Sequence, residues 1–156
     1  MNKKVLELLK AREFVSVATC DLQGRPNAAP KFILKLENNY IYLVDYIIGR
    51  TFQNIKANPR ISISFIDNNA LMGYQLNGSV EIIGSGQEYD SLVRDLSRKE
   101  VELSTRRIIE GVAKGKPHEG FELGISEKFV MLKVKIEEVV EIASSGSLKR
   151  EKICEC

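Results

Sequence analysis

Residues 41–63 read IYLVDYIIGRTFQNIKANPRISI, and the hydrophobic pattern changes its period twice within them. Tyr40 to Asp45 is apolar and rich in β-forming residues, which predicts a strand. From Gly49 to Ala57 the apolar residues fall at helical spacing, and Asn58-Pro59 provides a stop signal. Strand-like alternation resumes at Arg60 and continues to Asp67. The stretch therefore predicts a strand, a loop, a short helix and a second strand.

Further strand-like segments lie on both sides of this stretch. They run from Phe14 to Cys20, Ala28 to Glu37, Leu71 to Ile83 and Phe129 to Ile142. Short turns such as Asn38-Asn39 join several of them, which is typical of antiparallel neighbours. Helical spacing appears from Lys3 to Ala11 and, as two helices, between Gln87 and Gly115. Six strands in a chain of this length predict a small antiparallel barrel.

Length and composition set limits on the class of protein. A chain of 156 residues is expected to form one domain, and 23 basic against 21 acidic side chains give a net charge of only +2. This balance does not favour a nucleic-acid partner. No apolar run has the length of a membrane span, and three cysteines suit a reducing compartment. We expect no membrane segment and a cytoplasmic location.

Common enzyme motifs and metal sites find little support in the sequence. The chain has no Walker A, G-x-G-x-x-G, H-E-x-x-H or G-x-S-x-G pattern. His118 is the single histidine, and we interpret it as a solvated loop residue. Cys154 and Cys156 supply only two ligands, too few for a structural zinc site. We expect no metal, and no catalytic side chain is assigned.

Two short segments could bind a ligand. At Gly49-Arg50-Thr51 a helix N-terminus, a guanidinium and a hydroxyl would form an anion site, although Thr51 could equally cap the helix with Arg50 in solvent. Lys31 follows Asn27-Ala28-Ala29-Pro30, whose small residues allow a flat ligand to approach the backbone. Proline and lysine are also typical of a protected edge strand. From these residues alone, the first segment can be an anion site or a capped helix start. The second can be a ligand-binding strand or a protected edge strand.

In this order, the segments resemble the FMN-binding split β-barrel superfamily that pyridoxamine 5'-phosphate oxidase typifies. The resemblance covers about residues 5–84 and is carried by Ile41 to Asp45 followed by Gly49 to Ile63. It implies a mainly β fold with helices, a six-stranded antiparallel split β-barrel of the FMN-binding type. We expect a single domain over residues 1–143, with a helical insert at about 87–115 before the last strand, and a polar C-terminal tail at 144–156. The chain lacks tryptophan, so it departs from the true pyridoxamine phosphate oxidases and we do not expect their chemistry.

The resemblance also implies a cofactor site. Arg50 and Thr51 would hold the phosphate of FMN, with Gly49 at the turn, and Lys31 would point toward the flavin. The ring and ribityl chain would be lined by Ala28, Ala29, Pro30, Val44 and Asp45. Members of the superfamily usually form homodimers with two flavins at the interface, so a second copy is an expected partner.

The function implied is an FMN-dependent oxidoreductase that passes electrons from a reduced nicotinamide nucleotide, NAD(P)H, to a small acceptor. A non-catalytic flavin-binding or flavin-carrying protein is the first alternative. Another is a split barrel that binds heme or a deazaflavin, for which His118 or a cysteine would have to ligate heme iron. The least expected is a nucleic-acid binder that stacks bases on Tyr40, Tyr42 and Tyr74.

Overall fold

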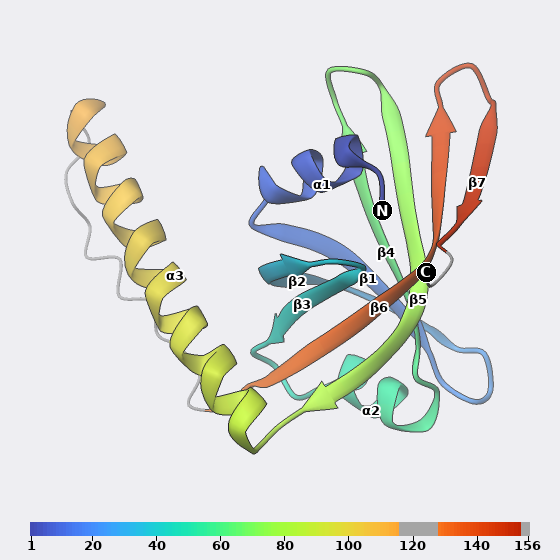
Figure 1. Ribbon diagram of the computed structural model, residues 1–156, viewed down its shortest axis with the longest axis horizontal. Coiled ribbons are helices and arrows are strands. Elements are labelled where there is room, and N and C mark those ends of the chain that lie inside the picture. The colour runs from blue at the N-terminus through green and yellow to red at the C-terminus, as the bar shows by residue number, and fades with distance from the viewer. Residues whose placement is uncertain (116–127, 154–156) are drawn as a thin grey trace.

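The computed structural model describes residues 1–115 and 128–153, and its strands form an antiparallel sheet closed into a barrel (Figure 1). Its elements are α1 (Lys3–Lys10), β1 (Phe14–Cys20), β2 (Pro26–Glu37), β3 (Tyr40–Asp45), α2 (Arg50–Ala57), β4 (Arg60–Asp67), β5 (Met72–Ile83), α3 (Gln87–Ala113), β6 (Val130–Ala143) and β7 (Leu148–Lys152). The strand order is β3-β2-β1-β4-β5-β6-β7, and β3 also pairs with β6. That pairing closes the first six strands into a ring, which confirms the predicted six-stranded antiparallel barrel.

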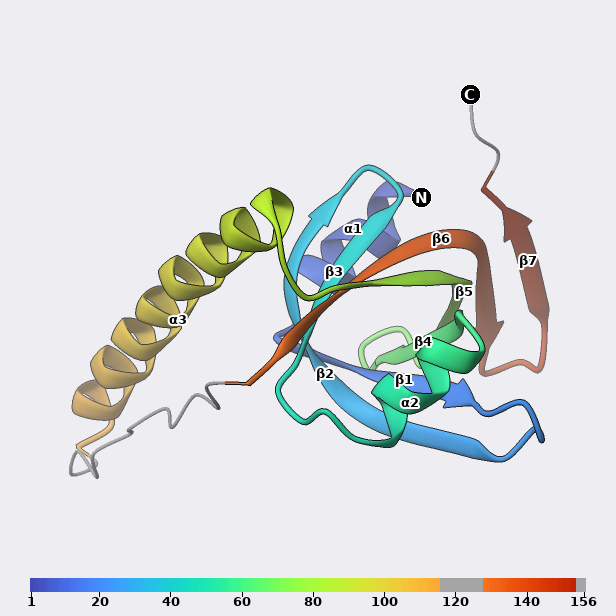
Figure 2. The ribbon, with the colours of Figure 1, turned by 90° about the horizontal axis from the view of Figure 1, so that it is seen from below.

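The interior of the barrel is filled by alternate residues of its strands. Val17, Ile63 and Leu76 come from three adjacent strands and are fully buried there. Helix α1 adds Val5 and Leu9 to the same core. The two short helices lie at opposite ends of the barrel, with α2 nearest the viewer in Figure 2. Helix α2 is therefore fixed against the barrel, which gives its N-terminus a defined position.

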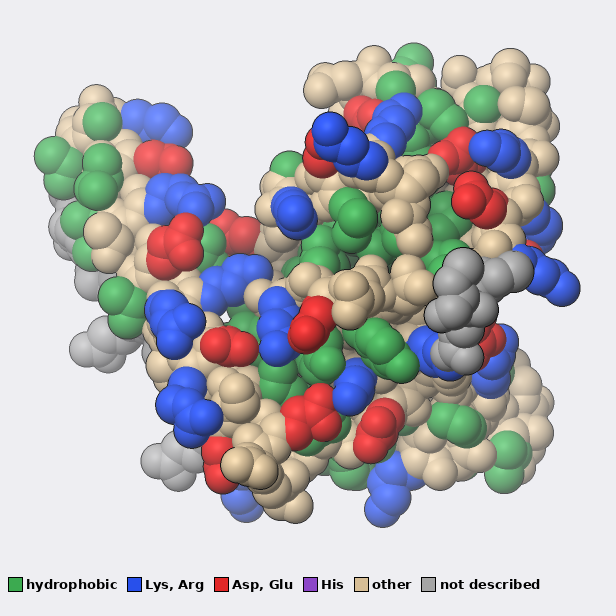
Figure 3. Space-filling view, in the orientation of Figure 1, with side chains coloured by type: hydrophobic (Ala, Val, Ile, Leu, Met, Phe, Trp, Pro, Cys, Tyr) green, Lys and Arg blue, Asp and Glu red, His purple; other side chains and the backbone are tan. Residues whose placement is uncertain are grey.

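Helix α3 builds a second apolar core on the outside of the barrel. The prediction of two helices between Gln87 and Gly115 was wrong, because one helix runs from Gln87 to Ala113 without an internal glycine or proline before Gly111. Its residues Leu92, Leu96 and Leu103 pack over the outer face of β2, β3 and β6. The C-terminal end of α3 stands away from the barrel (Figure 3), and no described helix is long and apolar enough to cross a membrane.

The second core explains why strand β2 does not alternate simply. Phe32 and Leu34 are buried outside the barrel under α3, whereas Ile33 is buried inside it. A register shift between Ile33 and Lys35 interrupts the pairing of β2 with β3. Lys31 shares the inward parity of Ile33, because it pairs with the core residue Val15. The chain thus turns this lysine toward the barrel.

The segment at 144–156 contains a strand that the sequence pattern did not indicate. Residues Leu148–Lys152 form β7, which pairs with β6 and is exposed along its whole length. It extends the sheet without entering the ring. The predictions for His118, Cys154 and Cys156 lie outside the described residues.

Gly78 is required where β5 bends around β6. A Cβ atom at this position would lie 1.9 Å from the carbonyl oxygen of Lys135, next to the register shift between Asn77 and Gly78. Gly78→Ala is therefore expected to lower the free energy of unfolding by about 3 kcal/mol, the upper end of overpacking penalties. The measurement is urea unfolding. Gly84→Ala is the control, because nothing lies within 4 Å of its added Cβ, and equal losses in both variants would contradict this explanation.

Candidate cofactor site

The N-terminus of α2 has no side-chain cap among the described residues. Gly49 occupies the N-cap position, so the interpretation of Thr51 as the cap was wrong; Thr51 lies inside the first turn and is buried. Its hydroxyl oxygen accepts a hydrogen bond from Asn27 Nδ2 at 3.0 Å, which leaves the hydroxyl proton available to another acceptor. Uncapped N–H groups at a helix N-terminus favour an anion. The arrangement suits a phosphate.

A polar cavity of about 310 Å³ lies beside this helix N-terminus. It is lined by Asp21, Gln23, Arg25, Arg50, Gln53 and Asn54. Asn54 is buried and donates through Nδ2 to Thr19 Oγ1 at 3.1 Å, which fixes the wall of the cavity. Of these lining residues, sequence reasoning identified only Arg50. The cavity forms where the β1–β2 turn meets α2.

Lys31 and Asp45 form a buried ion pair. Lys31 Nζ lies 2.6 Å from Asp45 Oδ1, and the two side chains are 8% and 0% exposed. The backbone N–H of Ile47 donates to the same oxygen at 3.3 Å. Asp45 Oδ2 has no hydrogen-bond partner in the described part of the chain. Both charges were predicted to face the flavin, and the structure directs them toward each other.

The loop between β3 and α2 is also attached to α3. The Tyr46 hydroxyl donates to Glu100 Oε1 at 2.9 Å across the second core. Burial, followed by this bond to Glu100, raises the pKa of Tyr46 well above its usual value. Tyr46 therefore stays protonated and acts as the donor. The helical insert thus helps to position the loop that precedes the candidate phosphate site.

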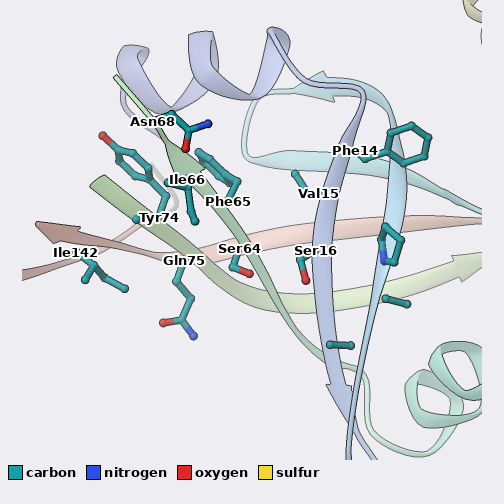
Figure 4. Close-up of a pocket in the computed structure, with 14 residues that line it drawn as sticks. Phe14, Val15, Ser16, Ser64, Phe65, Ile66, Asn68, Tyr74, Gln75 and Ile142 are labelled. Carbon is teal, nitrogen blue, oxygen red and sulfur yellow. The ribbon is translucent and has the colours of Figure 1, made fainter. Parts of the chain in front are cut away.

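A wide groove crosses the outer face of β2, β1, β4 and β5. It has a volume of about 860 Å³, and Figure 4 shows Ser16, Ser64 and Gln75 pointing toward it from three neighbouring strands. The predicted residues Ala28, Ala29 and Pro30 line the same groove. Its apolar rim includes Phe14, Ile66 and Ile142, which are 52%, 62% and 41% exposed. Small side chains at its floor leave room for a flat ring.

The structure brings together only some of the predicted site residues. The Asn27–Thr51 hydrogen bond joins the Gly49-Arg50-Thr51 segment to the strand that carries Ala28, Ala29 and Pro30. Val44 lies instead in the second core and is 1% exposed, and Lys31 and Asp45 are occupied by their ion pair. Asn27 and Arg25, which flank Pro26 in the β1–β2 hairpin, were not assigned to the site from the sequence. Finding them would have required the register of the β1–β2 hairpin, which decides which of its residues face α2.

Two of the three tyrosines proposed as stacking platforms are not arranged for that role. Tyr74 and Tyr42 are 1% and 6% exposed and pack in the first and second cores, respectively. Base stacking requires an accessible ring face. These two side chains therefore stabilise the fold instead of forming a surface for bases.

Comparisons with known proteins place this geometry in a family. The family model described as pyridoxamine 5'-phosphate oxidase matches residues 1–143. Heme oxygenase HutZ of Vibrio cholerae serotype O1 is 29% identical over 68 residues, 44% of this chain and 38% of HutZ. The match thus spans well under half the length of that relative.

Two solved structures show the same fold at low sequence identity. A protein related to general stress protein 26, from Clostridium acetobutylicum, is 22% identical, with a TM-score of 0.64 and coverage of 98% of this chain and 97% of that one. A pyridoxamine 5'-phosphate oxidase-related, FMN binding protein from Nostoc punctiforme is 15% identical, with a TM-score of 0.53 and coverage of 92% and 87%. At these identities, the likeness establishes the fold alone.

Proposed function

The chain belongs to the pyridoxamine 5'-phosphate oxidase family, and on that premise we propose that it is an FMN-binding flavoprotein that passes electrons from NAD(P)H to a small acceptor. The observation that carries the proposal is the uncapped N-terminus of α2, with Arg50 at its first position and the Thr51 hydroxyl beside it. Phosphate is the group that this donor set binds best. FMN ends in such a phosphate.

The remainder of FMN would lie in the groove that Ala28 and Pro30 line. The Asn27–Thr51 bond joins the start of α2 to β2, the strand that carries Ala28 and Pro30, and a ligand held at α2 would extend along this strand. The groove is wide, its floor is formed by small side chains, and its rim is apolar. These features support a ring that lies flat on the sheet. The Lys31–Asp45 ion pair would then lie beneath the ligand. It would hold the loop between β3 and α2 in position, because Asp45 also accepts the N–H of Ile47.

A second copy of the chain would cover the groove. Exposed Phe14, Ile66 and Ile142 form a patch of a kind that marks interaction surfaces. Covering it would bury the flavin ring and exclude water from it. We therefore propose a homodimer with FMN at the interface, and light scattering in solution tests its molar mass. A monomer at all concentrations would contradict this part of the proposal.

In this arrangement the cofactor would supply the redox chemistry, and the protein would bind and position it. FMN supplies the hydride and single-electron chemistry when it is bound. The chain holds the phosphate through Arg50 and Thr51, places the ring along β2, and keeps Tyr46 protonated at the loop. No side chain of the protein is required to act as an acid or base.

Heme is the second candidate ligand, because the relative HutZ is named a heme oxygenase. Heme iron requires an axial ligand, which a histidine or a cysteine thiolate commonly provides. Among residues 1–115 and 128–153, Cys20 is the single residue of either type, and its sulfur accepts a hydrogen bond from Asn58. The described residues therefore offer a phosphate anchor more readily than an iron ligand.

The test is to mix the purified chain with excess FMN, remove unbound flavin and record the visible spectrum. We expect a retained flavin spectrum with shifted bands, and faster oxidation of NADH or NADPH by the loaded protein than by free FMN. A folded chain that retains no FMN would contradict flavin binding, and heme retained in a parallel trial would favour the second candidate. Retained flavin without turnover across donors and acceptors would indicate a carrier.

A further inference from the structure

The sulfur of Met72 lies between two polar donors that come from different elements. Met72 begins β5 and packs, partly buried, against the barrel core. Lys4 of α1 donates through Nζ to Met72 Sδ at 3.8 Å, and the Tyr74 hydroxyl donates to the same sulfur at 3.9 Å. A thioether sulfur is a weak acceptor, whereas an ammonium and a phenol are strong donors. Helix α1 is thus joined to β5 here through one weak acceptor.

Tyr74 would gain most from a stronger acceptor at this point. Its side chain is 1% exposed, and its ring stacks on Phe65 with the centroids 5.2 Å apart (Figure 4). Among the described residues, Met72 Sδ is the hydrogen-bond acceptor of the Tyr74 hydroxyl. A buried donor with a poor partner carries part of its desolvation cost uncompensated. An oxygen at the position of the sulfur lone pairs would remove that cost.

Lys4 supplies a positive charge at the same point. Its ammonium lies 5.8 Å from the centroid of the Tyr74 ring. Contact with Tyr74, followed by the charges of Asp67 and Glu141, raises the pKa of Lys4, so the group stays protonated at neutral pH. A charged donor forms stronger hydrogen bonds than a neutral one, above all to an acceptor with a large partial negative charge. The pair of donors therefore suits an oxygen acceptor.

Oxidation of the thioether creates such an acceptor. The sulfur attacks one oxygen of hydrogen peroxide, the O–O bond breaks and an S–O bond forms. The leaving hydroxide takes the proton of the transferred oxygen and becomes water, so sulfur loses two electrons and the peroxide gains them. Methionine sulfoxide is the product, and reductases can return it to methionine. Met72 is partly exposed, whereas Met131 is fully buried in the second core.

We propose that Met72 is an oxidation site for hydrogen peroxide, and that Lys4 and Tyr74 bind the oxygen of its sulfoxide. In most packed positions a sulfoxide is disruptive, because a polar oxygen enters without partners. At Met72 both partners are already in place. The oxidised side chain would therefore fasten α1 to β5 more firmly than the thioether does. This role does not depend on the proposed cofactor.

The first measurement asks where the chain is oxidised. The full chain is treated with hydrogen peroxide, its cysteines are reduced again with dithiothreitol, and peptide mass spectrometry follows sulfoxide formation at Met1, Met72 and Met131. We expect Met72 to react roughly tenfold faster than Met131, because oxidation follows exposure. Equal rates at Met72 and Met131 would overturn the proposal.

The second measurement asks whether the two donors bind the new oxygen. Oxidation is expected to raise the melting temperature of the unaltered chain by about 2–4 °C, and to lower it in Lys4→Gln and Tyr74→Phe. Each variant is compared with its own reduced form, so any effect of the substitution itself cancels. Lys3→Gln is the matched control, because Lys3 lies on the same helix with its side chain 91% exposed. It should respond to peroxide as the unaltered chain does.

Met72→Leu keeps an apolar side chain of similar size and removes the sulfur. We expect peroxide to leave its melting temperature unchanged. If Met72→Leu shifts as much as the unaltered chain, another residue is responsible and the proposal is wrong. Equal shifts in the unaltered chain, Lys4→Gln and Tyr74→Phe would mean that neither donor binds the sulfoxide, which also overturns it.

Discussion

Replacing Arg50 by alanine is expected to raise the dissociation constant for FMN by about 10- to 100-fold. A hydrogen bond to a charged group contributes about 1.5–3 kcal/mol, and each 1.4 kcal/mol is a factor of ten in affinity. Arg50 is exposed at the start of α2 and lines the cavity, so its removal takes away a donor without disturbing the core. Titration of the flavin-free chain with FMN measures the change.

Lys56→Ala is the matched control for this variant. Lys56 lies in the last turn of the same helix and is also exposed, so both variants remove one positive charge from α2. We expect less than a twofold effect, because Lys56 is remote from the helix N-terminus. Equal losses in both variants would indicate a general charge effect. An unchanged dissociation constant for Arg50→Ala would mean that the phosphate does not bind at α2.

The same variant separates the two candidate cofactors. Heme has no phosphate, and iron ligation would contribute much of its binding. Arg50→Ala is therefore expected to release FMN and to leave heme binding within about twofold of the unaltered chain. Absorbance titration with each cofactor measures both affinities on one preparation. Loss of heme binding alone would contradict the assignment of α2 as a flavin phosphate site.

Local patterns were sufficient to predict most of the strands and their antiparallel pairing. Turns such as Asn38-Asn39 forced neighbouring strands to be antiparallel, and the Asn58-Pro59 stop fixed the end of α2. Strands β1, β3 and β4 begin and end at the predicted residues. The closure of the ring by β3 and β6 pairs segments about 90 residues apart, and it followed from the family resemblance and the strand count.

Features that depend on a helix packed against the strands could not be predicted from the hydrophobic pattern of the strands alone. Lys31 alternates with Phe32 in the sequence, a pattern typical of an exposed lysine opposite a buried phenylalanine. Helix α3 instead buries Phe32 from outside, so the opposite face of β2 turns inward with Lys31. Likewise, the sequence around Arg25 does not indicate that α2 packs against its hairpin, so its place in the cavity could not be predicted. Such contacts are set by the packing of distant segments.

Removing one partner of the Lys31–Asp45 pair is expected to lower the free energy of unfolding by about 3–5 kcal/mol. Lys31→Met leaves a fully buried carboxylate whose remaining donor among the described residues is the N–H of Ile47, at 3.3 Å. Asp45→Leu leaves a lysine side chain that is 8% exposed without its counter-charge. Globular domains are stable by only about 5–15 kcal/mol, so either loss is large. Urea unfolding at neutral pH measures it.

The double variant tests whether the loss comes from an unpaired charge. Lys31→Met with Asp45→Leu removes both charges, and we expect it to be within about 1 kcal/mol of the unaltered chain, because two desolvation penalties vanish together. Glu102→Gln breaks the exposed Arg106–Glu102 pair and should cost less than about 0.5 kcal/mol. If the two single changes at Lys31 and Asp45 cost no more than this surface pair, water reaches the buried charges. Additive losses in the double variant would instead mean that each side chain stabilises β2 and β3 by packing alone.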